Sequence, residues 1–236
     1  YVRVFVSGEY GQISELYAWI ALLLAILTFG METTFFRFSQ KEDSRKVFNN
    51  AETLVLLIST VFLLFYCFFY KSFAELIHYE FNTHYVLLLG IIVAVDAAAA
   101  IPFAMLRKEN KAGRFSLIKT INVLTNIFFN ILFLVIIPEK SMMIAEHIFG
   151  QQTSLLIWVF VSNILASVLN LILLAPQLST LKISLNKELI IPMLRYSFPI
   201  LLISLVGMIN EVADKILIKY LVTIPDAETL ASMNIT

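Results

Sequence analysis

The sequence has little of what a water-soluble domain needs, because only 14% of its 236 residues are charged while 59% are apolar. Its single cysteine, Cys67, excludes an intrachain disulfide and, with no second cysteine or histidine nearby, is a poor metal ligand. Seven glycines and six prolines are too few for a collagen-like or disordered chain. Seventeen basic residues balance seventeen acidic ones, so the sequence predicts no nucleic-acid partner.

The signatures of common catalytic sites are missing as well. The sequence contains no His-Glu-x-x-His, no Gly-x-Ser-x-Gly, no Walker lysine loop and no dinucleotide-binding glycine motif. Its three histidines, His78, His84 and His147, have no second histidine at the spacing of a metal site. The sequence therefore predicts neither catalytic residues nor a metal centre, and transport is a better prediction than enzymatic activity.

Long apolar stretches take up most of the chain. A bilayer core of about 30 Å needs about 20 apolar residues in a helix, and six stretches reach that length. They are Leu16 to Phe36, Ala51 to Tyr70, Tyr85 to Leu106, Phe115 to Ile137, Ser154 to Ala175 and Met193 to Leu221. Because a lipid-facing backbone must satisfy its own hydrogen bonds, the sequence predicts an all-α, polytopic membrane bundle of about six helices.

Basic residues alternate between the predicted loops. The five loops hold 4, 1, 5, 1 and 3 Lys or Arg residues in chain order, so every second loop is basic. Loops rich in Lys and Arg stay on the cytoplasmic side of the membrane. The alternation predicts that the first, third and fifth loops are cytoplasmic, and that Tyr1 and Thr236 lie on the opposite side, which in a bacterium is the periplasm.

Ionisable residues inside the predicted spans need a partner, a proton or contact with water, because a bare charge in hydrocarbon is costly. Asp96 lies in the middle of the third span with no basic residue within one helical turn. In the sixth span Glu211 and Lys215 stand four residues apart, as in an ion pair on one helix face, which leaves Asp214 over. Asp96 is either a protonated structural residue or a functional one, and the sequence leaves both readings open.

Amides recur at helical spacing in two neighbouring spans. Asn122, Asn126 and Asn130 follow one another at four-residue steps in the fourth span, and so lie on one face of a helix. Asn163, Ser167 and Asn170 continue the theme in the fifth span. Hydrogen bonds between helices explain such stripes as well as the alternative, which is a cavity lining that meets a hydroxyl-rich ligand.

Two prolines, Pro102 and Pro199, fall inside apolar spans and remove backbone hydrogen bonds there. We therefore expect bends in the third and sixth spans, with Gly207 as a further loose point in the sixth.

Several segments carry motifs in an order and at separations that are specific when taken together. Residues 9–11 (EYG) open a span that residues 29–38 (FGMETTFFRF) close, and residues 101–107 (IPFAMLR) lead to 111–115 (KAGRF). Residues 196–199 (YSFP) precede Asn210 and the pair Asp214 and Lys215. In this order the three segments resemble the second helix, the basic turn between the fourth and fifth helices, and the seventh helix of bacterial polysaccharide exporters and oligosaccharide flippases.

The resemblance implies a piece of a larger transporter. The family belongs to the multidrug/oligosaccharidyl-lipid/polysaccharide exporter superfamily, whose members have twelve to fourteen helices in two lobes. Residues 1–192 then form most of the N-terminal lobe, helices two to six of the family. Residues 193–236 form the first helix of the C-terminal lobe and the outward loop after it, and the rest of that lobe is absent.

The resemblance also implies a function. We expect a flippase or exporter in the bacterial inner membrane that moves undecaprenyl-linked oligosaccharide by alternating access, with membrane lipids around it. No cofactor is expected, although family members suggest coupling to a proton or sodium gradient. By the same resemblance Arg37 and Arg107 lie at the cytoplasmic mouth of the cavity, and Asp214 and Lys215 on the lobe-facing seventh helix.

Two alternatives remain beside the flippase. The first is a multidrug or cation antiporter of the same superfamily, which the acidic Asp96 inside a span keeps open. The second is an intramembrane transferase that acts on lipid-linked sugars, and the missing catalytic motifs weigh against it.

Overall fold

The computed structural model describes residue 5 and residues 7–79, 82–150 and 153–221, with side chains described as far as Ile209. Within these residues the secondary structure is entirely helical. The helices are α1 (Ser7–Thr28), α2 (Met31–Phe38), α3 (Ser44–Leu76), α4 (Thr83–Lys108), α5 (Ala112–Ile131), a π-helical turn (Leu132–Ile136), α6 (Pro138–Phe149), α7 (Ile157–Leu173), α8 (Ala175–Leu178) and α9 (Lys187–Leu221). The predicted all-α architecture is confirmed.

Five helical segments of the described chain are long and apolar enough to cross a membrane. They are Gly8–Phe38, Ser44–Leu76, Thr83–Lys108, Ala112–Ile136 and Lys187–Ile209. The remaining predicted stretch, Ser154 to Ala175, forms the shorter apolar helix α7 (Ile157–Leu173). The chain is a polytopic helical bundle, and its helices follow the predicted apolar stretches closely.

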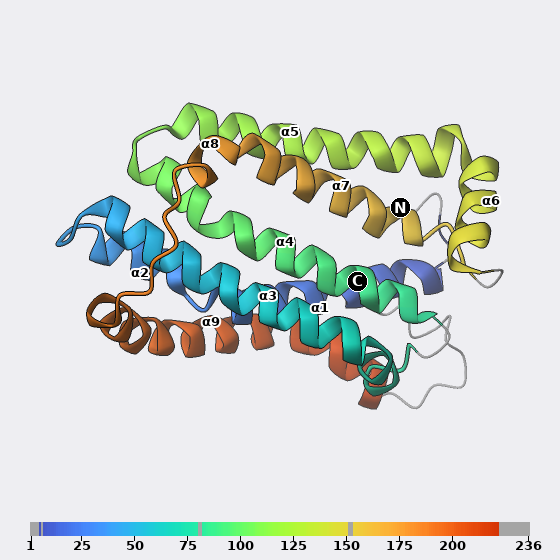
Figure 1. The fold of residues 1–236 in the computed structure, drawn as a ribbon. Helices are drawn as coiled ribbons and strands as arrows, with labels where there is room; N and C mark the ends of the chain where they lie inside the picture. The colour runs from blue at the N-terminus through green and yellow to red at the C-terminus, as the bar shows by residue number, and fades with distance from the viewer. Residues whose placement is uncertain (1–4, 6, 80–81, 151–152, 222–236) are drawn as a thin grey trace.

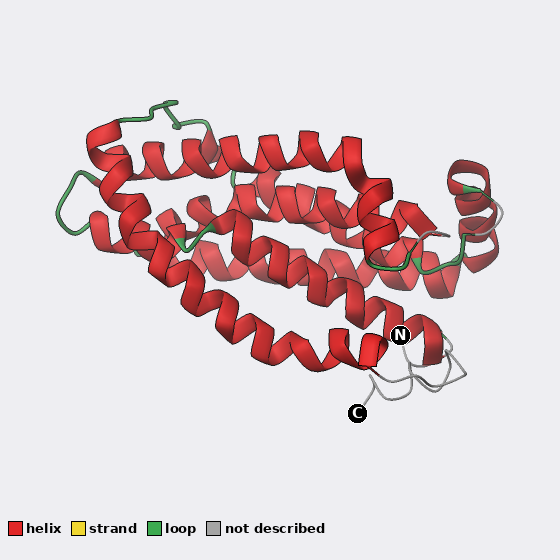
Figure 2. Cartoon of the chain, turned by 90° about the horizontal axis from the view of Figure 1, so that it is seen from below, coloured by secondary structure: helices red, strands yellow, loops and turns green. Residues whose placement is uncertain are grey.

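The long helices run side by side, and most of the loops lie at the two ends of the bundle (Figures 1 and 2). The connections 39–43, 109–111 and 179–186, which lie within the three predicted basic loops, gather at one end, where α8 and the start of α9 also lie (Figure 1). Helix α6 lies across the opposite end, where the Trp158 indole N–H of α7 donates to the Ser141 carbonyl at 3.0 Å. Every second connection between the long helices therefore lies at the same end of the bundle, and these are the connections of the predicted basic loops.

The first predicted span, Leu16 to Phe36, lies within the segment Gly8–Phe38, which is long and apolar enough to cross a membrane, but this segment is not one continuous helix. Helix α1 ends at Thr28, and Phe29 and Gly30 adopt positive φ angles of 54° and 63° before α2 begins at Met31. Glycine adopts this left-handed conformation without the steric penalty that a Cβ brings. By contrast, α4 continues through Pro102, and α9 continues through Pro192 and Pro199.

Helix α4 occupies the centre of the bundle and packs most closely against α3. The Tyr66 ring of α3 lies directly against Gly90 of α4, and its hydroxyl donates to the Val86 carbonyl at 2.9 Å. Ala97 and Ala104 follow Gly90 at seven-residue steps, and all three are buried. Small residues at this spacing let two membrane helices approach closely, so α4 supplies a narrow face on which α3 rests.

This contact makes a prediction about stability. Replacing Gly90 by Val places a side chain where the Tyr66 ring now lies, so we expect a loss of about 1–3 kcal/mol, as for overpacked cores, and a lower Tm of the purified protein. Gly113→Ala is the matched control, because a Cβ there meets nothing within 4 Å. An unchanged Tm for Gly90→Val would show that the close approach of α3 and α4 is not required.

Candidate functional site

Polar residues of the bundle form two groups. The first, at the end that carries the basic loops, consists of Glu32 and Arg37 on α2 and Arg107 at the end of α4 and is called the α2 charge group. The second lies part-way along the bundle between four helices and is called the mid-bundle group; its members are Tyr17, Asp96, Lys119, Asn163 and Ser167. Both groups include residues that the sequence singled out.

In the α2 charge group, Arg107 is paired rather than free. Its guanidinium forms an ion pair with the Glu32 carboxylate, and both side chains stay partly exposed, at 39% for Arg107 and 43% for Glu32. The guanidinium also lies over two rings, 5.2 Å from the centroid of Phe36 and 5.4 Å from that of Phe115. Because part of its surface still faces outward, Arg107 retains donors for a second anionic partner.

Arg37 lies on the same short helix but contacts another element. Its guanidinium stacks over the Tyr196 ring of α9 at 4.8 Å, and Phe38 meets that ring edge-on at 6.1 Å. Seven residues earlier in the chain, Gly30 also lies against α9, because a Cβ added to Gly30 would be 2.8 Å from Ile200 Cγ2. Arg37 and Arg107 therefore both lie at α2, but Arg37 contacts Tyr196 of α9 and Arg107 pairs with Glu32 of α2.

The mid-bundle group gives Asp96 the partner on another helix that membrane energetics demands. The Ser167 hydroxyl of α7 contacts the Asp96 carboxyl and lies 3.4 Å from Asn163 Oδ1. Asn163 in turn donates to the Tyr17 hydroxyl of α1 at 3.1 Å. Four polar side chains from α1, α4 and α7 thus form one connected group.

Lys119 of α5 supplies the opposite charge to this group. Its ammonium lies within electrostatic range of Asp96 and stands over the Phe103 ring at 4.2 Å from the centroid. The sequence hides this relation, because the two residues are far apart in the chain and lie on different spans. The two groups attract each other over more than ion-pair distance, so the attraction offsets only part of the cost of holding charge at this depth.

The amide stripe of α5 faces inward. Asn130 is buried and Asn122 and Asn126 are half-buried, whereas the residues between them on the other face are exposed: Val123, Leu124, Ile127 and Phe128. Asn130 Nδ2 donates within the helix, to the Asn126 carbonyl at 2.8 Å and to Asn126 Oδ1 at 2.7 Å. Asn130 Oδ1 and, on α7, Asn170 Oδ1 have no hydrogen-bond partner among the described residues, so each retains an acceptor.

The sequence analysis missed Glu52 on α3. Its side chain is fully buried, and neither carboxyl oxygen has a hydrogen-bond partner among the residues that the structure describes. Counting seven-residue steps back from Tyr66, which contacts α4, leads to Ser59 and then Glu52, so the three residues lie on the same side of α3. The spacing of Glu52 to the apolar Phe48 and Val55 was the available signal, but Glu52 was not singled out although it lies inside the predicted second span, as the second residue of the stretch Ala51 to Tyr70.

The candidates Glu211, Asp214 and Lys215 lie outside the part of the chain whose side chains the structure describes. Helix α9 continues through them to Leu221, and their roles stay predictions. Among the described residues no group of three or more His, Cys, Asp or Glu is placed to hold a metal ion.

The charge balance of the mid-bundle group can be tested by stability. Asp96→Leu leaves Lys119 without its counter-charge, so we expect a lower Tm, whereas Asp96→Asn keeps a polar side chain for Ser167 and is expected to cost less. The double variant Asp96→Leu/Lys119→Leu should recover part of the loss, with a coupling energy of about 0.5–3 kcal/mol. Strict additivity of the two single substitutions would contradict the proposed compensation.

Comparison with known proteins assigns the chain to a family. No curated protein and no solved structure matches it. A family model described as "polysaccharide biosynthesis protein" matches residues 1–229, nearly the whole chain. Together with its apolar helices, the match makes the chain a multi-pass membrane protein related to polysaccharide transport. The chain belongs to the polysaccharide biosynthesis protein family.

Proposed function

We propose that this chain is most of one lobe, with the first helix of the next, of a transporter that flips lipid-linked oligosaccharide across the bacterial cytoplasmic membrane by alternating access. The observation that carries the proposal, beside the family, is the α2 charge group. It places two arginines at the end of the bundle with the basic loops, which we assign to the cytoplasm, where such a substrate is made.

The chemistry of the substrate fits these arginines. Undecaprenyl-linked oligosaccharide carries a pyrophosphate between lipid and sugar, and guanidinium groups bind phosphate through paired N–H donors. In the structure Glu32 is the ion-pair partner of Arg107. A pyrophosphate carries more negative charge than one carboxylate, so it can replace Glu32 as the partner of Arg107 while the Phe36 and Phe115 rings keep the guanidinium in place.

Movement of α9 relative to α2 is the step that we assign to alternating access. Residues 193–236 belong to the second lobe in this proposal, and the described part of α9 touches α2 through the Arg37–Tyr196 stack and the Gly30–Ile200 contact. Separation of these two helices removes the Tyr196 ring from the Arg37 guanidinium and leaves its donors to a substrate beside Arg107. The sugars then meet hydroxyl and amide groups, for which the inward stripes of α5 and α7 are candidates.

A gradient of protons or sodium ions is the energy source that we propose, and no other cofactor is needed. Asp96 and Glu52 provide carboxyl groups inside the bundle that can hold a proton or a small cation. The same two acids favour a second candidate function, a cation or multidrug antiporter of the same superfamily. Either function makes the protein a transporter and not an enzyme, with both ends of this chain on the periplasmic side.

The proposal predicts a transport defect from one arginine. In cells that carry the full-length protein, Arg107→Gln should lower the rate at which glycan reaches the periplasm by about tenfold or more, because a hydrogen bond to a charged group is worth about 1.5–3 kcal/mol. Lipid-linked repeat units should accumulate on the cytoplasmic side, as measured by labelling of extracted lipids.

The control is Lys140→Gln, an exposed residue of α6 at the opposite end of the bundle, which should leave export unchanged. Normal export by a stably folded Arg107→Gln variant would rule out a role for this arginine in binding. Altered drug resistance with unaffected glycan export would favour the antiporter.

A further inference from the structure

The segment between α8 and α9, residues 179–186, crosses α3 in an extended conformation (Figure 1) and is called the strap. Three alternate backbone N–H groups of the strap donate to three polar side chains of α3. The pairs are Lys182 to Asn49 Oδ1 at 3.1 Å, Ser184 to Thr53 Oγ1 at 3.2 Å and Asn186 to Asn50 Oδ1 at 2.6 Å. Because alternate residues of an extended chain point the same way, one edge of the strap is fixed to α3.

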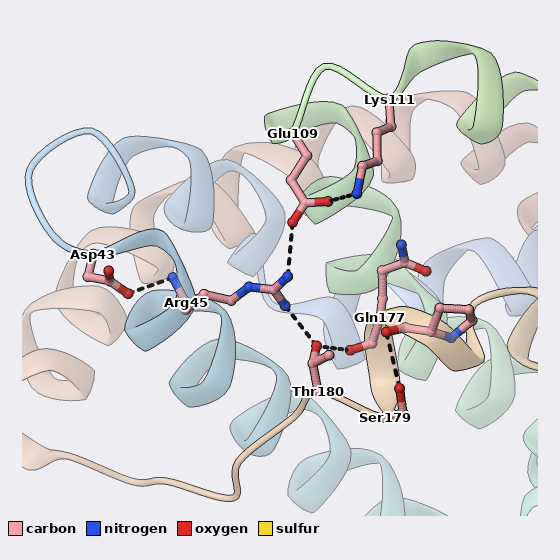
Figure 3. Close-up of polar contacts among 8 residues, drawn as sticks. Asp43, Arg45, Glu109, Lys111, Gln177, Ser179 and Thr180 are labelled. Atoms are coloured by element: carbon pink, nitrogen blue, oxygen red, sulfur yellow. Dashed lines mark hydrogen bonds and ion pairs between the residues drawn. The ribbon is translucent and has the colours of Figure 1, made fainter.

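Both ends of the strap are fixed as well. Figure 3 shows the Arg45 guanidinium of α3 donating to the Thr180 hydroxyl at 2.7 Å and to Glu109 Oε1 at 3.1 Å. At the other end Asn186 Oδ1 accepts the Glu188 N–H at 2.9 Å, within the first turn of α9. The strap is therefore held in one conformation and presents a defined outer side.

That outer side is apolar with basic flanks. Ile183 is 86% exposed and Leu185 is 48% exposed, and both alternate with the residues whose N–H groups bind α3. Lys182 and Lys187 stand beside them and are exposed. Residues 179–186 contain no acidic residue, and the exposed Glu188 follows Lys187 in the first turn of α9. Two exposed apolar side chains next to two cations are suited to the surface of a membrane, where acyl chains lie beneath anionic lipid headgroups.

The depth of the strap fits the same surface. Helix α3 has 33 residues and is about 50 Å long, so about 20 Å of it extends beyond a hydrocarbon core of about 30 Å. Its outward apolar face begins at Leu57, 49% exposed, one turn after Thr53. The strap thus lies where the apolar face of α3 gives way to polar residues, at the end with the basic loops.

We propose that the strap is an interfacial anchor that binds the surface of a membrane containing anionic lipid. Ile183 and Leu185 enter the boundary between headgroups and acyl chains, and Lys182 and Lys187 pair with lipid phosphates. Held by α3 on one edge and by the leaflet on the other, the strap fixes the start of α9 at a constant depth.

The test places a fluorophore on the strap of the full-length protein in lipid nanodiscs. In a background in which Cys67 and any cysteine of the rest of the full-length protein are replaced by Ser, Ile183→Cys is labelled with an environment-sensitive dye, and quenching by iodide and by spin-labelled lipids is measured. Leu57→Cys is the control for a lipid-facing site, and the exposed Lys41→Cys of a basic loop is the control for water. Leu185→Cys is a second position should the first label disturb folding.

We expect the Ile183 label to behave like the Leu57 label, quenched by lipid and protected from iodide. Spin-labelled phosphatidylglycerol should quench more than spin-labelled phosphatidylcholine, by about fivefold for each nearby Lys, and Lys182→Gln/Lys187→Gln should remove this preference. Quenching by iodide as strong as at Lys41 overturns the proposal. Protection from both quenchers also overturns it, since another segment of the protein then covers the strap. None of these readouts depends on transport.

Discussion

The close packing of α4 against its neighbours is the interaction on which the rest of the structure depends. Gly90, Ala97 and Ala104 give α4 a narrow face for α3, and Tyr66 closes that contact with a hydrogen bond to the α4 backbone. Its other faces carry the chemistry, with Asp96 directed to α7 and Arg107 to α2. Since lipid offers no hydrophobic force between helices, such packing and polar contacts must hold the bundle together.

Apolar length, charge alternation and composition were enough to predict the helical bundle and the common end of its basic loops. The same patterns misplaced local details. Phe29 and Gly30 interrupt the first stretch because α9 approaches the backbone there, and an approach by a distant helix leaves no periodic signal in sequence. Helices α4 and α9 continue as helices through Pro102 and Pro199, and the bends expected at these prolines stay a prediction.

The site was predictable by residue type but not by partner. An acid in the middle of a span needs a counterpart, and Asp96 has one, but its identity depends on how α4, α5 and α7 are aligned. The two arginines lie at the same end of the bundle, but sequence did not identify their partners, which are Glu32 for Arg107 and Tyr196 for Arg37. Glu52 escaped notice because burial between α3 and α4 is a property of packing and not of hydropathy.

The central claim, that this family member moves a pyrophosphate-linked glycan between leaflets, is tested most directly with the purified full-length protein in sealed vesicles. A fluorescent lipid-linked oligosaccharide is loaded into one leaflet, and its appearance in the other is followed with an impermeant quencher or lectin. The account predicts transfer that requires the protein and is faster with an imposed proton or sodium gradient. Transfer no faster than in protein-free vesicles, from a preparation that is folded and binds the substrate, would contradict it.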